Sequence, residues 1–337
     1  MILKFCQKIG QFLKENIKMI LGFIVIFIIL TFEFPYYIET PGGIIDTTSR
    51  FDLESSYSSK GSLNLAYVGQ LRATLPLLLY SKINSDWKLI PKKEVVLENE
   101  TVRDVEFRDR LMLDEANNTA IKLAYQKAGK PYKILESKLY ITYIDRLAKT
   151  NLKVQDQILM IDNQIISNSE QMHHLIAEHS VGDVLKIKVL HNGKEYTRTA
   201  QVIEYENVKM IGVVASTSEK IETTPSIQIQ FKNSESGPSG GLMMTLSIYN
   251  SLISKDITKG YKIVGTGTIQ EDGTVGSIDG VEYKLMGAVK EKADIFLVPD
   301  GENYQDAYRL KQKKNYNIEI VPVKTLEEAI NYLTKKE

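Results

Sequence analysis

The chain has almost no cysteine. Of its 337 residues only Cys6 is one, which excludes an intramolecular disulfide framework and any cysteine-based zinc site. Histidine is nearly as scarce, with four residues, all between positions 173 and 191. His173, His174 and His179 share one short segment that is predicted to be helical, but their order is not that of a His-Glu-x-x-His zinc motif. We therefore expect no metal and no cofactor.

The sequence also lacks an excess of charge of either sign. Lysine and arginine number 42, aspartate and glutamate number 42, and no dense basic patch is interleaved with aromatic residues. Because nucleic-acid binding depends on such a patch, we expect no nucleic-acid partner. A Gly-x-x-x-x-Gly-Lys-Ser/Thr loop is absent too, which excludes an ATPase of the P-loop class. Any activity should be independent of ATP.

One long hydrophobic run is present, close to the N-terminus. Residues 17–34 are apolar apart from Lys18, Thr31 and Glu33, and about 20 such residues suffice to cross a bilayer as a helix. The alternative is a cleavable signal peptide, but its hydrophobic region is shorter and small residues follow it, whereas large side chains follow here. Lysines precede the run, so the positive-inside rule predicts a cytoplasmic N-terminus, a single transmembrane anchor in the cell membrane and an extracellular chain after about Tyr36.

Two short blocks late in the chain predict a serine nucleophile and a lysine base. Residues 236–241 read Ser-Gly-Pro-Ser-Gly-Gly, a tight turn that can present Ser239 beside inward-pointing backbone N–H groups. Serine needs a partner that takes its proton, and the histidines are far away in the sequence. Lys284, 45 positions later at the glycine-led start of a helix, is the leading candidate. The alternative is an ordinary loop and a solvated lysine.

The order and spacing of these blocks resemble the proteolytic domain of Lon-type proteases, most strongly over residues 231–299. The Gly-Pro-Ser-Gly-Gly sequence is similar to the family's Gly-Pro-Ser-Ala-Gly motif, with Gly240 in place of alanine. The 18 positions from Thr266 to Lys284 fit the family's spacing without a gap. The resemblance implies that Ser239 is the nucleophile, Lys284 the general base and Thr266 a hydroxyl that orients the lysine amine, with Gly237 and Gly240 as supporting positions.

A lysine can act as a base only when it is uncharged. Its pKa is ordinarily near 10.4, so desolvation must lower that value by several units, and the neighbours Val281 and Leu285 are apolar. A neutral Lys284 amine could take the Ser239 proton, and the alkoxide would attack a peptide carbonyl to give an acyl-enzyme. The helix that begins near Gly241 would stabilise the developing oxyanion.

The middle of the chain resembles a bacterial PDZ domain. Strand-like runs surround one helical stretch, and residues 147–166 and 181–193 are similar to the core and the end of that family's sequence. A PDZ domain binds an extended peptide by adding it to a sheet edge beside a helix. We expect Lys138–Ile144 to be that strand and Ser169–His179 the helix. A glycine-hydrophobic loop is not visible before Lys138, so a C-terminal carboxylate and an internal segment are equally plausible ligands.

The predicted fold class is α/β (α+β): a Lon-type proteolytic domain with an inserted PDZ-like, β-rich module and an N-terminal transmembrane helix. Residues 36–43 are similar to the start of the ectodomain in the membrane-anchored, PDZ-containing Lon-like family of Gram-positive bacteria, which includes pheromone-processing enzymes. The expected divisions are a cytoplasmic N-terminus (1–16), the anchor (17–35), an ectodomain segment that joins the catalytic domain (36–130), the PDZ-like module (131–205) and the proteolytic domain (206–337).

The predicted function is an ATP-independent, membrane-anchored serine endopeptidase. The resemblance implies that it cleaves exported peptides, such as pheromone precursors, or small membrane proteins at the cell surface, with the bilayer and a peptide substrate as partners and a homo-oligomer possible. The alternatives are a catalytically silent, PDZ-type peptide-binding scaffold and a chaperone. An intact set of Ser239, Lys284 and Thr266 favours the peptidase, because a binding module has no use for it.

Overall fold

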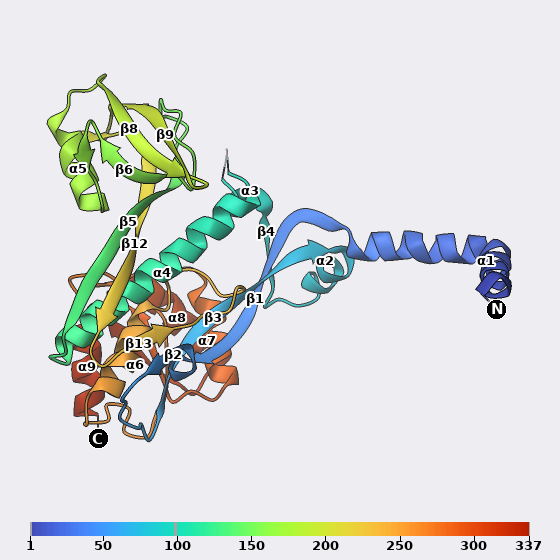
Figure 1. Cartoon of the computed structure of the whole chain (residues 1–337). Coiled ribbons are helices and arrows are strands. Elements are labelled where there is room, and N and C mark those ends of the chain that lie inside the picture. Colours follow the sequence, from blue (N-terminus) through green and yellow to red (C-terminus); the bar gives the residue numbers. More distant parts are fainter. Residues whose placement is uncertain (1, 98–99, 337) are drawn as a thin grey trace. The chain divides into compact units, whose positions relative to one another are not determined.

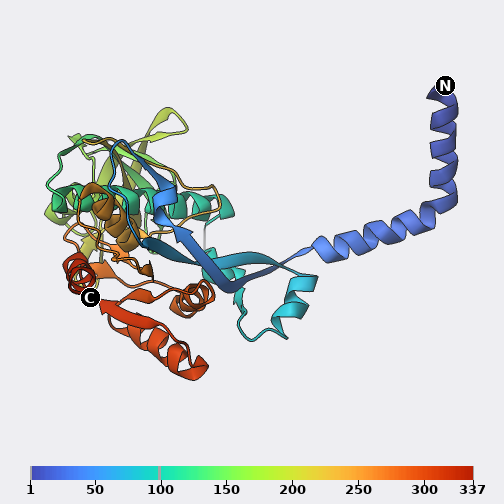
Figure 2. The same cartoon turned by 90° about the horizontal axis from the view of Figure 1, so that it is seen from below.

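The computed structural model describes residues 2–97 and 100–336, which form a mixed α/β structure in two compact units (Figures 1 and 2). Unit 1 contains the chain up to residue 40 and residues 69–95. Unit 2 contains residues 41–68 and the chain from residue 96 on. Strands β1 (Glu33–Asp46) and β3 (Ser62–Thr74) each begin in one unit and end in the other.

Unit 1 contains the residues of the predicted anchor, most of which lie in α1 (Ile2–Thr31). Its other elements, besides the parts of β1 and β3, are α2 (Leu75–Ser81), β4 (Lys88–Pro91) and α3 (Lys92–Val95). Strand β4 pairs antiparallel with β1. Residues 71–74 continue β3, and α2 starts at Leu75, with proline in its first turn.

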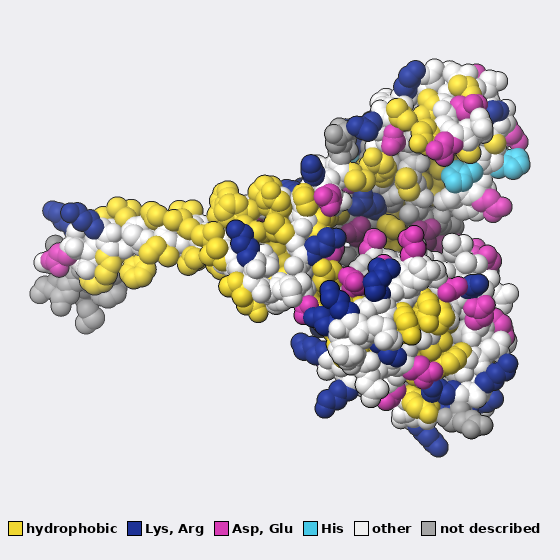
Figure 3. All heavy atoms as spheres, turned by 180° about the vertical axis from the view of Figure 1, so that it is seen from behind, with side chains coloured by type: hydrophobic (Ala, Val, Ile, Leu, Met, Phe, Trp, Pro, Cys, Tyr) yellow, Lys and Arg dark blue, Asp and Glu magenta, His cyan; other side chains and the backbone are white. Residues whose placement is uncertain are grey.

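Helix α1 exposes large apolar side chains along its described length, from Phe12 to Leu30, and Figure 3 shows them gathered on its surface. Across the part of the chain that the structure describes, no helix combines the length and the apolar character needed to cross a membrane. The anchor predicted for residues 17–35 is therefore not supported by the structure.

A parallel sheet forms the centre of unit 2. Strands β18 (Glu319–Val323), β17 (Ile295–Pro299), β14 (Lys262–Gly265) and β3 are parallel neighbours in that order. Successive side chains of a strand point to opposite faces, so Leu65 and Ala66 enter different cores. Helices α6 (Gly241–Leu252) and α9 (Leu326–Lys335) contribute to the first core, and α7 (Val281–Lys290) and α8 (Glu302–Lys314) to the second.

A long helix, α4 (Val102–Lys127), packs against α6. It begins at Thr101, whose hydroxyl and Asp104 form a reciprocal capping box. Ala120 and Ala124 pack against Met244 and Ile248, and these small side chains allow the two helices to approach closely. The other elements of this region are η1 (Thr47–Arg50), β2 (Phe51–Leu53), β13 (Ile227–Ile229), β15 (Thr268–Ile269) and β16 (Val275–Gly276).

A second sheet lies in the middle of the chain. Its strand order is β12 (Val213–Thr223), β5 (Tyr132–Ile144), β6 (Gln157–Ile161), β8 (Val184–His191) and β9 (Lys194–Gln201), and β7 (Gln164–Ile165) pairs with β6. Helix α5 (Ser169–Glu178) packs on this sheet, and a short hairpin of β10 (Ile203–Tyr205) and β11 (Val208–Met210) follows β9. The strand predicted over Lys138–Ile144 and the helix predicted over Ser169–His179 are confirmed as β5 and α5. Strand β12 extends the sheet beyond residue 205, as far as Thr223.

Candidate functional site

The turn that carries Ser239 is held by backbone hydrogen bonds from two sides. Gly237 has a φ of +87°, which favours glycine, and its N–H donates to the Asp109 carbonyl of α4 at 3.1 Å. The Ser239 carbonyl oxygen accepts from the Gly267 N–H at 2.8 Å and from the Thr266 hydroxyl at 3.1 Å. The turn that carries Ser239 is thus fixed to the segment that follows β14.

Thr266 is fully buried and contacts Ser239 through the backbone carbonyl of that residue. The predicted role was to orient the lysine amine. A hydroxyl has one proton and two lone pairs, so a Thr266 that donates to Ser239 can still accept a hydrogen bond from an amine. The observed bond therefore adds a role in positioning Ser239 and leaves the predicted role open.

Helix α6 begins two residues after Ser239 and is buried at every residue except Tyr249. The N–H groups of Gly241 and Leu242 already donate to the carbonyls of Pro238 and Gly267. An oxyanion at this turn would therefore need amides nearer to Ser239, with the positive end of the α6 dipole behind them.

Lys284 lies in the first turn of α7, and its side chain is almost fully buried, with the residue 4% exposed. Its neighbours Val281 and Leu285 belong to the core beneath β14 and β17. A Cβ atom on Gly240 would meet Leu65, and one on Gly280, the residue before α7, would meet Val68. The starts of α6 and α7 thus both lie near β3, at Leu65 and at Val68 respectively. The structure brings Ser239 and Thr266 into contact and places Lys284 in the first turn of α7.

An ion pair braces the loop that leads to Ser239. The Arg50 guanidinium donates to the Glu235 carboxylate through Nη2 at 2.5 Å and Nε at 3.0 Å, with both side chains largely buried. The Lys232 N–H also donates to this carboxylate. Burial by itself would raise the pKa of Glu235, but the hydrogen bonds from Arg50 and Lys232 outweigh it and lower that pKa. No local pattern predicted this pair, because its members are 185 positions apart in the sequence.

The predicted peptide-binding strand, Lys138–Ile144, is wrong. Both edges of this part of β5 are paired, with β12 along its length and with β6 at Leu139 and Tyr140. Its backbone groups are therefore engaged in two ladders, and a peptide cannot add to it. Strand β12 lies at the edge of the sheet and contacts helix α5, so it is the better position for an added strand.

A glycine-hydrophobic loop, which is not visible before Lys138, does precede β12. It reads Ile211-Gly212-Val213, and Gly212 has a φ of +70°. A Cβ atom there would lie 2.8 Å from the Cβ of Ala148, so the position requires glycine for both conformation and space. The signal was present in the sequence, but it lies beyond the predicted boundary of the module.

The outward-facing backbone of β12 is held by side chains instead of a neighbouring strand. The Thr217 N–H donates to the Glu115 carboxylate at 3.2 Å, and the Glu219 carbonyl accepts from Asn118 at 3.1 Å. Closer to the loop, the Ala215 carbonyl accepts from the Ser169 hydroxyl. These alternate residues define the outer edge of β12, which extends from the loop toward the turn of Ser239.

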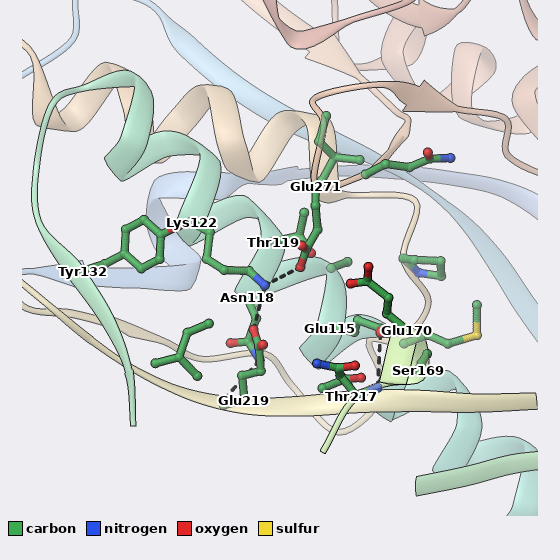
Figure 4. A pocket seen from close by; sticks show the side chains of 17 residues that line it. Glu115, Asn118, Thr119, Lys122, Tyr132, Ser169, Glu170, Thr217, Glu219 and Glu271 are labelled. Atoms are coloured by element: carbon green, nitrogen blue, oxygen red, sulfur yellow. Dashed lines mark hydrogen bonds and ion pairs between the residues drawn. The ribbon is translucent and has the colours of Figure 1, made fainter. Parts of the chain in front are cut away.

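A cavity of about 610 Å³ lies along this edge, as Figure 4 shows. Its lining comes from α4, β12, the start of α5 and the turn between β15 and β16, and it includes Pro238, the residue before Ser239. Lys122 donates to Glu219 at 2.7 Å and also to Glu271, so it ties α4 to β12 and to the turn. No group of three or more histidine, cysteine, aspartate or glutamate side chains within residues 2–97 and 100–336 is arranged to hold a metal ion.

Comparison with known proteins identifies the middle module. Residues 129–202 match the sequence model of the PDZ domain family. This part of the chain is a PDZ domain. Solved PDZ domains of SdrC-like proteins are similar to it. The one from Listeria monocytogenes is 20% identical and covers 25% of this chain and 92% of its own, with a TM-score of 0.23. The one from Listeria innocua is 24% identical and covers 23% and 92%, with a TM-score of 0.22.

The curated relatives are Lon proteases. The Lon protease of Xanthomonas oryzae pv. oryzae is 32% identical over 95 residues, which are 28% of this chain and 11% of that protein. The Lon protease of Mesomycoplasma hyopneumoniae is 29% identical over 99 residues, which are 29% of this chain and 11% of that protein. The chain thus spans about a tenth of the length of these relatives. The likeness makes a PDZ-containing, Lon-like protein plausible.

The glycine at position 240 is coupled to Leu65. A Cβ atom at Gly240 would lie 2.8 Å from Leu65 Cδ2, so an alanine there must displace that side chain. We predict that Gly240→Ala is better tolerated in a Leu65→Val background than in the wild type, with a coupling free energy of about 1 kcal/mol in a double-mutant cycle measured by urea unfolding. Strictly additive effects would contradict this contact.

Removing the charge of Glu235 should lower stability in a pH-dependent way. The folded-state pKa of Glu235 is lowered, so its contribution is present above the ordinary glutamate value and disappears as the pH falls through the lowered value. We expect Glu235→Gln to lower the free energy of unfolding by about 1–2 kcal/mol at pH 7, and by less at an acidic pH at which the folded-state carboxylate is protonated. A loss that is equal at both pH values would argue against the ion pair.

Proposed function

We propose that this protein is a serine endopeptidase of the Lon type, with Ser239 as nucleophile and Lys284 as general base. The observation that carries the proposal is the arrangement at one end of the parallel sheet. A glycine-rich turn presents Ser239 at the start of the buried helix α6, Thr266 and Gly267 bond to its carbonyl, and a buried lysine lies in the first turn of α7.

The proposed reaction needs only these side chains and water. Neutral Lys284 takes the Ser239 hydroxyl proton as the oxygen attacks the peptide carbonyl, and amides near Ser239 bind the oxyanion. The tetrahedral intermediate collapses with cleavage of the C–N bond, and the Lys284 ammonium gives its proton to the departing amine. Water then attacks the acyl-enzyme, again with Lys284 as base, and the carboxylic acid product leaves with Ser239 restored.

A second candidate function is a peptide-binding scaffold without turnover. The PDZ domain favours it, because PDZ domains bind peptide segments in general and the outer edge of β12 lies beside α5. In the peptidase proposal the same domain delivers the substrate. The two candidates differ in whether Ser239 and Lys284 are needed for function.

Activity of the full-length protein separates them. We expect cleavage of unstructured reporter peptides without ATP or added metal, and a loss of kcat by at least about 1,000-fold in Ser239→Ala and in Lys284→Met. Lys290→Met, a lysine in the last turn of the same helix, is the matched control and should retain activity. Peptide retention without cleavage by any form would favour the scaffold.

We also propose, from the sequence, that the N-terminus is cytoplasmic and the catalytic part extracellular. Self-association is a further proposal from the sequence. Cys6 is the sole cysteine, so a membrane-impermeant maleimide reports directly on its side of the membrane. We expect no labelling of Cys6 in intact cells and full labelling after permeabilisation. In a Cys6→Ser, Tyr57→Cys double variant, the cysteine at position 57 should be labelled in intact cells. Labelling of Cys6 in intact cells would refute this topology.

A further inference from the structure

The cavity beside Ser239 carries more negative than positive charge. Four glutamates line it, Glu115, Glu170, Glu219 and Glu271, and Lys122 is the basic residue among its lining side chains. Lys122 is bonded to two of these carboxylates, Glu219 and Glu271. Its single charge therefore leaves the cavity with an excess of three negative charges when all four glutamates are ionised.

Glu115 and Glu170 lie at one side of the cavity, away from the ion pairs of Lys122 (Figure 4). Glu115 is half-buried on α4, and burial raises its pKa more than the hydrogen bonds from Thr217 and Ser216 lower it. Glu170 is exposed in the first turn of α5. A cation that entered this side of the cavity would offset the cost of burying the Glu115 charge.

The wall opposite α4 is the outer edge of β12. At this edge the Thr217 N–H and the Glu219 carbonyl are bonded by side chains of Glu115 and Asn118, which can exchange their bonds for those of a peptide backbone. An extended peptide adds to a sheet edge through such alternate groups. Because Pro238 lines the same cavity, a strand on this edge would lie next to the turn of Ser239.

We propose that this cavity is the substrate channel of the Ser239 site and that it selects an extended peptide segment with a lysine or arginine side chain. The segment adds along the outer edge of β12, and its cationic group lies between Glu115 and Glu170. This inference rests on the proposed peptidase function for the step of cleavage. Binding of the segment itself does not depend on turnover.

The volume and the charge fit such a segment. A cavity of about 610 Å³ lies within the range of about 300–1,000 Å³ that ligand sites occupy. Each carboxylate beside the cationic group contributes a favourable Coulomb interaction, from which the cost of desolvation is subtracted. A glutamate side chain of the peptide at the same position would be repelled by the same groups, so discrimination arises from both attraction and repulsion.

The test uses the full-length Ser239→Ala protein and three fluorescent peptides that differ at one central position, which is lysine, glutamine or glutamate. We expect binding, measured by fluorescence anisotropy, to be strongest for lysine and to weaken as salt is raised. Glu115→Gln and Glu170→Gln should each weaken binding of the lysine peptide about 3- to 10-fold and leave the glutamine peptide nearly unchanged. Glu178→Gln, an exposed residue of α5 outside this cavity, is the matched control and should have no effect.

The same peptides are then offered to the protein with Ser239 intact, so that the two proposals can fail separately. Selective binding of the lysine peptide without cleavage would support the channel and overturn the peptidase. Cleavage of all three peptides at equal rates, with no effect of Glu115→Gln or Glu170→Gln, would support the peptidase and overturn the channel. Equal loss with Glu178→Gln would also overturn the channel, because the effect would then not depend on the cavity.

Discussion

The carbonyl oxygen of Ser239 is the contact on which the proposed site depends. It accepts hydrogen bonds from Thr266 and Gly267, which follow directly on β14. The Gly267 carbonyl oxygen accepts a hydrogen bond from the N–H of Leu242, the second residue of α6. These hydrogen bonds therefore join the end of the parallel sheet and the start of the helix at the turn that carries Ser239. Any displacement of β14 against α6 would move Ser239, which is why the buried packing of α6 matters for chemistry as well as for stability.

Strand β12 links the two parts of unit 2. It is the edge strand of the PDZ sheet beside α5, and farther along the chain its outer edge faces α4 and the cavity next to Pro238. The same backbone edge thus passes through two environments. In the proposed binding mode, the first environment provides backbone pairing and the loop at Gly212. The second provides charged side chains of α4 and of the turn between β15 and β16, which would add selectivity.

Local patterns in the sequence predicted the local structure well. The glycine-rich turn before Ser239 and the helix predicted over Ser169–His179 depend on residues within a few positions of one another. The cavity could not be predicted in this way, because Lys122 lies 97 positions from Glu219 and 149 from Glu271. The peptide-binding strand was predicted wrongly at Lys138–Ile144 for a related reason. Strand β12 lies at the edge of the PDZ sheet because it pairs with β5. The residues of a strand do not by themselves show which other strand it pairs with.

The proposed peptidase mechanism requires a covalent acyl-enzyme at Ser239. The most direct measurement is intact-protein mass spectrometry of the full-length chain, quenched with acid shortly after mixing with an activated peptide ester, followed by mapping of the modified residue. We expect a mass increase equal to the acyl fragment, located on Ser239 and absent from Ser239→Ala. An unmodified protein that releases product at the same rate, or an acyl group on another residue, would contradict it.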